Sequence, residues 1–225
     1  MRGDASSPRP RIAVIDYGAG NLVSIEQALT SVGAEVVVAR DEAALGAADA
    51  LVVPGVGAAG PAMSRLGRAG LIGPILEWIA ADRPYLGICL GLQVLFEGSD
   101  EDGATTLGVL PGRTSRLVDA PTLPHIGWNQ VERVREHPLL DGIADGADMY
   151  FVHSYAGVPA LSPDVEDVVL ARTEHGRRFV SAVARSRLLG VQFHPERSGT
   201  DGLRLLANFV GLVRSGALAG VGAAV

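Results

Sequence analysis

Short apolar runs separated by helical segments constrain the fold of this chain most strongly. In the first half, apolar runs occupy residues 11–16, 35–39, 50–53 and 84–88. We expect helices between or after them, over residues 21–31, 71–81 and 90–97. Strands that are apolar throughout, rather than alternating, are typical of a parallel sheet covered on both faces. The sequence therefore predicts an α/β fold, an open twisted, largely parallel sheet flanked by helices, with Asn21 capping the first helix.

The second half has a different pattern. Short β-type runs follow one another at residues 114–118, 130–134, 149–155, 168–173, 179–184 and 188–193. Turn residues separate them, so we expect hairpins that add antiparallel strands to the sheet or form a side sheet. A last helix is expected over about 203–213. Because no linker or repeat is visible, the expected organisation is a single domain over residues 1–225, with flexible ends at about 1–10 and 215–225.

Composition narrows the classes of function. The chain has 225 residues and a formal net charge of −6, which argues against nucleic acid as the main partner. The single cysteine excludes an internal disulfide and fits a reducing compartment. The first ten residues lack the apolar stretch of a secretion signal, and no run is long enough to span a membrane. We expect a cytoplasmic protein without membrane attachment.

Cys89 lies in the sequence Gly-Ile-Cys-Leu-Gly, at the end of the apolar run 84–88. A lone cysteine most often acts as a small buried hydrophobe. This one, however, is expected at a strand-to-helix corner with a small residue on each side, which is the pattern of a nucleophile elbow. The helix that begins at Leu90 points its amino end toward the thiol and favours the thiolate. We therefore interpret Cys89 as a nucleophile.

A second candidate segment ends the apolar run 188–193. His194 and Glu196 stand two positions apart around Pro195. In an extended segment their side chains project to the same side, so the carboxylate is expected to orient the imidazole. An ordinary strand-end histidine beside a surface glutamate is the alternative. Together with the elbow, these residues predict a catalytic triad of Cys89, His194 and Glu196.

Two glycine-rich turns follow other predicted strands. In the first, residues 54–57 (Pro-Gly-Val-Gly), backbone N–H groups are expected to point into the crevice. The N–H groups of Val56 and Leu90 are the candidate oxyanion hole; a plain tight turn explains the 54–57 motif equally well. The second, residues 17–21, resembles a dinucleotide-binding loop only weakly, since the third glycine is missing.

Taken together, these motifs resemble the class I glutamine amidotransferases and, more narrowly, the glutaminase subunits of imidazole glycerol phosphate synthases of histidine biosynthesis. The resemblance covers nearly the whole chain, from residue 12 to 209. It rests on residues 15–22, 54–57, 87–93, 124–129, 151–155 and 190–196. The elbow and the His-Pro-Glu segment are common to the class. The segments 15–22 and 124–129 are specific to the subfamily. The fold implied is flavodoxin-like.

The resemblance implies a role for each matching residue. Cys89 attacks the side-chain carboxamide of glutamine, His194 protonates the departing ammonia, and Glu196 orients His194. Other matching positions surround the glutamine, with Glu101 near its α-ammonium group and the backbone at 154–155 near its carboxylate. These positions are Gly55, Gln93, Glu101, Ser154 and Tyr155. No metal and no cofactor is implied.

The resemblance also implies a partner, the (βα)8-barrel cyclase subunit, in a heterodimer. Ammonia would pass to that subunit, which makes imidazole glycerol phosphate and aminoimidazole carboxamide ribotide. Residues 17–21 and 128–129 match interface positions. Arg197 stands where lysine is usual, so a salt contact to the cyclase is expected to be arranged differently. We expect glutaminase activity to be very low without the partner, because the Gly55–Val56 peptide would point its N–H away.

Three alternatives remain open at this point. An amidotransferase subunit of another synthase, of the anthranilate or aminodeoxychorismate type, would keep the triad and serve another acceptor. A stand-alone γ-glutamyl hydrolase would need a peptide-sized cleft, for which the sequence gives no sign. A non-catalytic flavodoxin-like binding module would leave Cys89 an inert buried thiol.

Overall fold

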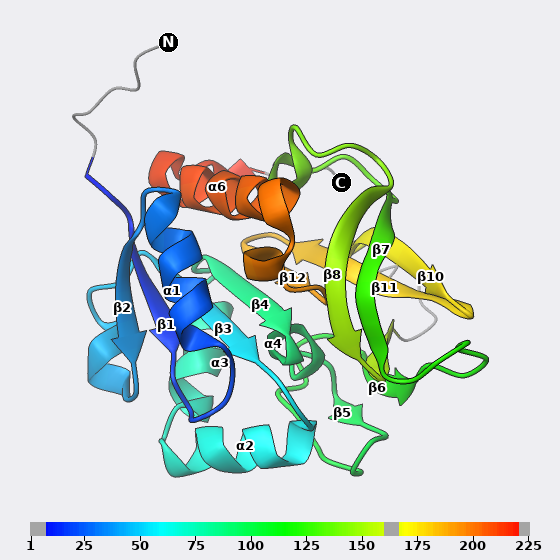
Figure 1. Cartoon of the computed structure of the whole chain (residues 1–225). Coiled ribbons are helices and arrows are strands. Elements are labelled where there is room, and N and C mark those ends of the chain that lie inside the picture. Colours follow the sequence, from blue (N-terminus) through cyan, green and yellow to red (C-terminus); the bar gives the residue numbers. More distant parts are fainter. Residues whose placement is uncertain (1–7, 160–166, 221–225) are drawn as a thin grey trace.

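Five parallel strands form one half of the larger sheet (Figure 1). Four of them come from the first half of the chain, as the apolar runs there predicted. The fifth, Leu188–Val191, comes from the second half, where antiparallel strands were expected, and pairs in parallel with Tyr85–Cys89. The computed structural model describes residues 8–159 and 167–220. The sheet has nine strands in the order β2-β1-β3-β4-β12-β11-β10-β7-β8. The parallel strands are β1 (Arg11–Ile15), β2 (Glu35–Ala39), β3 (Ala50–Gly55), β4 (Tyr85–Cys89) and β12 (Leu188–Val191).

Antiparallel strands from the second half extend this sheet and also contribute a pair to a side sheet, so both expected arrangements occur. The extension consists of β7 (His125–Arg133), β8 (Ala147–His153), β10 (Val169–His175) and β11 (Arg177–Arg185). The side sheet consists of β5 (Gly98–Ser99), β6 (Gly112–Arg116) and β9 (Tyr155–Pro159). The run expected over 149–155 is divided at Ser154, because β8 pairs with β7 whereas β9 pairs with β6.

Helices cover both faces of the parallel half. They are α1 (Leu22–Ser31), α2 (Ala59–Arg68), α3 (Ile72–Ala80), α4 (Leu90–Gln93) and α6 (Gly199–Ser215). Short 3-10 turns are Glu42–Leu45, Pro138–Leu140, Pro195–Arg197 and Ala217–Gly220. Ile12 and Val14 of β1 pack in the core under α1 and α6, whereas Ala13 and Ile15 pack in the core with α2 and α3. Both faces of β1 are therefore buried, which explains its unbroken apolar sequence.

Two local expectations were wrong, and one helix was missed. The helix expected over 90–97 ends at Gln93, because the carbonyls of Val94 and Phe96 accept hydrogen bonds from residues 107 and 108 instead. Asn21 makes no side-chain capping bond to α1. Helix α2 was not expected, since its sequence contains two glycines and a proline; Pro61 is tolerated because it stands in the first turn.

Parts of the expected flexible ends are ordered. The Pro10 carbonyl accepts a hydrogen bond from the N–H of Glu35. Leu218, beyond the last long helix, is buried against the core. Residues 1–7 and 221–225 lie outside the described part of the chain. Within that part, no helix combines the length and apolar character needed to cross a membrane.

Candidate active site

Cys89 occupies the corner between β4 and α4, where the elbow was predicted. Its backbone has φ +53° and ψ −107°, a conformation that residues other than glycine rarely adopt. The side chain is 4% exposed and lies at the carboxyl end of the parallel strands. Such backbone strain at a strand-to-helix turn is characteristic of a nucleophile elbow.

The two glycines of the elbow are required by close approaches of the backbone. A Cβ atom on Gly91 would lie 1.7 Å from the carbonyl oxygen of Val53 on the neighbouring strand. A Cβ atom on Gly87 would lie 2.4 Å from the carbonyl oxygen of Gly91. Neither distance is compatible with a side chain, so the small residues on both sides of Cys89 are what permits the turn.

Strand β12 brings His194 to Cys89 from a hundred residues downstream. It runs parallel to β4, with Val191 opposite Ile88, so the residues after Val191 lie beside the elbow. The N–H of His194 donates to the carbonyl of Tyr150 at 2.9 Å, and the Ser198 hydroxyl donates to the His194 carbonyl at 2.7 Å. These bonds fix the backbone of His194 in a buried position.

Glu196 holds the imidazole of His194, as predicted. The distance between Nδ1 of His194 and Oε1 of Glu196 is 2.8 Å, and both side chains are buried. The local geometry differs from the expected extended segment, because Pro195–Arg197 form a 3-10 turn. The turn, rather than strand alternation, returns the carboxylate to the ring.

The protonation of His194 is set by its two partners. Burial alone lowers its pKa, but the neighbouring Cys89 sulfur and the Glu196 carboxylate outweigh burial and raise the pKa to about 10. Nδ1 is bonded to Glu196, whereas Nε2 is buried and has no hydrogen-bond partner among the described residues. Nε2 is therefore the nitrogen available to exchange a proton with the thiol. Hydrogen bonds of this kind often align only when substrate binds.

A cavity of about 150 Å³ opens beside the sulfur. Four of the five residues expected around glutamine line it together with Cys89: Gln93, Glu101, Ser154 and Tyr155. The rest of the lining is Gly57, Pro124, Val152 and His153. The pKa of Glu101 is raised by burial and by the adjacent Asp102. The cavity thus brings the Cys89 thiol and the Glu101 carboxylate together in one place.

Gly55 lies next to Cys89 rather than on the cavity wall. It is the register partner of Cys89 on β3, and a Cβ atom there would lie 2.2 Å from the phenol oxygen of Tyr17 and 2.9 Å from Cβ of Leu90. The side chain of Val56 is 45% exposed, and Gly57 with φ +90° follows it. The segment 55–57 therefore passes directly beside Cys89.

Gln192 is a residue of the site that the sequence analysis did not assign. Its Nε2 donates to Sγ of Cys89 at 3.5 Å, and its Oε1 accepts from Nε2 of Gln93 at 3.1 Å. The signal was a polar residue inside an apolar strand run, and its side chain is fully buried. Gln93 in turn donates to the carbonyl of Tyr155 at 2.7 Å, which ties the elbow to the cavity wall.

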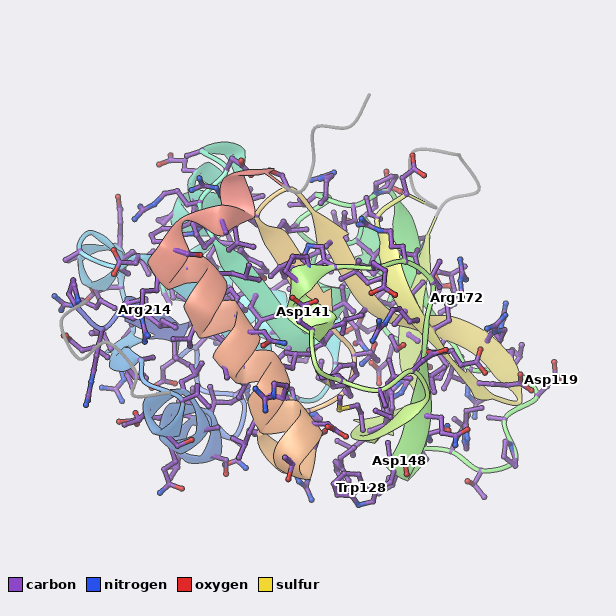
Figure 2. The ribbon with its side chains drawn as sticks, turned by 90° about the horizontal axis from the view of Figure 1, so that it is seen from above. Asp119, Trp128, Asp141, Asp148, Arg172 and Arg214 are labelled. Atoms are coloured by element: carbon purple, nitrogen blue, oxygen red, sulfur yellow. The ribbon has the colours of Figure 1, made fainter. Side chains whose placement is uncertain are left out.

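Two candidate interface segments differ in exposure. Tyr17 is buried against Gly55, so its ring is not presented to a partner. Gly18, the next residue, is exposed. Trp128 is 56% exposed and projects from the margin of the molecule near the start of α6 (Figure 2). The Arg197 guanidinium lies 4.0 Å from the centre of the Tyr150 ring, which also contacts Trp128 edge to face.

Comparison with known proteins agrees with this geometry. The family model for class I glutamine amidotransferases matches residues 13–212. The imidazole glycerol phosphate synthase subunit HisH of Symbiobacterium thermophilum is 48% identical over 88% of this chain and 92% of its own. The HisH subunit of Moorella thermoacetica is 47% identical over 93% of this chain and 98% of its own.

Solved structures share the fold at lower identity. A crystal structure of a glutamine amidotransferase has a TM-score of 0.69 at 23% identity, over 90% of this chain and 98% of that chain. The PurLQS structure from Thermotoga maritima has a TM-score of 0.69 at 19% identity, with the same coverage. The chain belongs to the class I glutamine amidotransferase family and, within it, to the HisH subunits of imidazole glycerol phosphate synthase.

Proposed function

We propose that this chain is the glutaminase subunit of imidazole glycerol phosphate synthase, which hydrolyses glutamine to glutamate and ammonia. The observation that carries the proposal is the position of Cys89 on the wall of a cavity and beside His194, whose imidazole is held by Glu196. High identity to HisH subunits over most of the chain supports the assignment to this synthase rather than to an anthranilate or aminodeoxychorismate synthase.

The reaction proceeds through a thioester. The Cys89 thiolate attacks the carboxamide carbon of glutamine, and the carbon–nitrogen bond breaks as His194 gives its proton to the departing ammonia. Water then loses a proton to His194 and attacks the thioester carbon. The carbon–sulfur bond breaks and glutamate leaves, losing its new carboxyl proton to solvent, so that the Cys89 thiolate and the protonated His194 are restored. Glu196 keeps the imidazole oriented through both steps.

The cavity supplies the groups that recognise glutamine. The Glu101 carboxylate is the partner for the α-ammonium group, and the backbone of Ser154 and Tyr155 is the partner for the α-carboxylate. Gln93 completes the wall through its bond to the Tyr155 carbonyl. These roles follow from the lining of the cavity and from the charges that glutamine carries.

The oxyanion formed at each step needs backbone donors. The N–H of Leu90, in the first turn of α4, has no partner within the helix and adjoins the nucleophile. The N–H of Val56 is the second donor. Gly55 has no side chain to restrict its backbone, so we expect the Gly55–Val56 peptide to rotate between a resting and an active orientation. Partner binding would select the active one.

The partner is the (βα)8-barrel cyclase subunit, which receives the ammonia. Strand β7 presents exposed Ile126 and Trp128, large apolar residues that a docking subunit would cover. The exposed Arg197 lies over the Tyr150 ring, which Trp128 contacts edge to face, and is the cation of this surface. Gly18 and Asn21, in the loop before α1, are exposed as interface residues need to be.

The test is reconstitution with purified cyclase subunit. Glutamate release should rise strongly when the cyclase and its nucleotide ligand are added, and imidazole glycerol phosphate should form from glutamine. An anthranilate synthase synthetase subunit, added at the same concentration, should have no effect. The proposal fails if the cyclase neither binds the chain nor stimulates glutamate release.

A further inference from the structure

A chain of hydrogen bonds links the outside of β7 to the wall of the cavity. His125 and His153 are register partners on β7 and β8, which lie side by side in Figure 1. Nδ1 of His125 is 3.2 Å from Nε2 of His153, and Nδ1 of His153 is 2.9 Å from the Tyr155 carbonyl. On the other side, Nδ2 of Asn129 is 3.1 Å from Nε2 of His125. Both imidazoles are buried.

Asn129, at the outer end of this series of hydrogen bonds, fixes the direction of every bond in it. Oδ1 of Asn129 accepts from the N–H of Gln130 at 2.8 Å, and Nδ2 donates to the Glu174 carbonyl at 2.9 Å. The group facing His125 is therefore a donor, so Nε2 of His125 must accept. A neutral His125 then carries its proton on Nδ1 and donates it to Nε2 of His153.

The inner end gives the same direction independently. The Tyr155 carbonyl only accepts, so Nδ1 of His153 must carry a proton. Nε2 of a neutral His153 is then an acceptor, as the bond from His125 requires. A proton added to either ring at Nε2 would place two donors face to face, so the chain is intact only while both rings are neutral.

The surroundings keep both rings neutral. Burial lowers the pKa of His125 to about 4, and the adjacent His175 acts in the same direction. Burial lowers the pKa of His153 to about 3; the Tyr155 carbonyl opposes this, while His125, His175 and His194 add to it. His175 stacks on His125 with ring centres 4.0 Å apart but bonds to the Thr122 carbonyl, outside the chain.

The bonded chain continues from Tyr155 to the nucleophile. The Tyr155 carbonyl accepts from both His153 and Gln93, and Gln93 bonds Gln192, which donates to Cys89. His153 and Tyr155 both line the cavity. In the described part of the chain no group of three or more histidine, cysteine and acidic residues is placed to hold a metal ion.

We propose that Asn129, His125 and His153 form a positioning relay that fixes the Tyr155 carbonyl, and with it Gln93, in the wall that binds glutamine. The proposal rests on the proposed glutaminase function. None of the three residues acts on the scissile bond. Because the relay sets the backbone expected to meet the α-carboxylate, its loss weakens glutamine binding more than it slows the chemical step.

The kinetic test uses the complex with the cyclase subunit. His125→Phe keeps the ring stacking but removes both bonds, and should raise KM for glutamine about tenfold with kcat changed less than about threefold. His125→Asn retains a donor toward His153 and should recover most of the loss. Asn129→Ala removes the outer donor without touching the core. His175→Phe, which stacks on the same ring outside the relay, should behave as wild type.

A second readout is independent of activity. Ring ¹⁵N NMR of the full-length protein should show His125 and His153 as neutral Nδ1–H tautomers at pH 7, and His125→Phe should change the His153 signals. An Nε2–H tautomer or a charged ring at either position overturns the relay, as does a KM rise in His175→Phe equal to that in His125→Phe. If the wild-type complex releases no glutamate, the proposed function fails while the NMR result still decides the relay.

Discussion

Gln192 donates a hydrogen bond from its side-chain amide to the sulfur of Cys89 at 3.5 Å, while the oxygen of the same amide accepts one from Gln93. Gln192 directly follows β12, the strand that also leads to His194. The Cys89 sulfur is therefore held between the elbow and the segment after a neighbouring strand.

Gln192→Leu should slow the alkylation of Cys89 by iodoacetamide. A hydrogen bond to an ionised group contributes about 1.5–3 kcal/mol, so the rate at pH 7 should fall roughly tenfold or more. Ser181→Ala is the matched control: Ser181 is buried nearby, its carbonyl accepts from the Gln192 N–H, and its hydroxyl has no partner among the described residues. Equal rates in wild type and Gln192→Leu would show that the bond has no role in activating the thiol.

Gly91→Ala should prevent the elbow from forming. The added methyl group would lie 1.7 Å from the Val53 carbonyl oxygen, which forces the backbone apart. We expect the free energy of unfolding to fall by more than about 3 kcal/mol in urea titrations. Gly211→Ala, in the exposed middle of α6 with no atom within 4 Å of the new Cβ, should instead stabilise the chain by about 0.5–1 kcal/mol. Similar stability of Gly91→Ala and wild type would contradict the described turn.

The Cys89 elbow and the contact between His194 and Glu196 were predictable because each depends on a few adjacent residues. Gly87, Cys89 and Gly91 carry the turn, and His194 and Glu196 carry the acid–base pair. The relay was not predictable, since His125 and His153 meet only through the register of β7 and β8. Helix α2 was missed because its glycines and proline weaken the helical signal, while burial of its apolar face against the sheet stabilises it.

Acid should destabilise the fold through the buried histidines. The pKa of His125 is lowered to about 4, below the ordinary value of 6.5. The stability that its neutral ring contributes to the fold is therefore full above pH 6.5 and is lost as pH falls toward 4. Between pH 7 and 5, this one group should remove about 2 kcal/mol of stability. Over the same pH range, the free energy of unfolding of His125→Phe should fall by about 2 kcal/mol less than that of wild type, measured by urea unfolding at both pH values. Identical losses would mean that His125 is not held neutral.

Glu101→Gln should weaken glutamine binding specifically. Loss of the carboxylate that meets the α-ammonium group should raise KM for glutamine about tenfold to a hundredfold, because a charged hydrogen bond contributes about 1.5–3 kcal/mol. Synthesis from added ammonium salt, which bypasses the cavity, should be unchanged in the complex. Glu42→Gln, on the exposed 3-10 turn Glu42–Leu45, is the control. An unaltered KM in Glu101→Gln would remove Glu101 from the binding site.

The most direct measurement compares two nitrogen sources in the Cys89→Ala complex with the cyclase subunit. Alanine removes the sulfur but leaves the elbow backbone and the docking surface in place. Formation of imidazole glycerol phosphate should stop when glutamine is the nitrogen source and continue at nearly the wild-type rate when an ammonium salt is supplied. Continued synthesis from glutamine without the sulfur would contradict the assignment of Cys89 as the nucleophile.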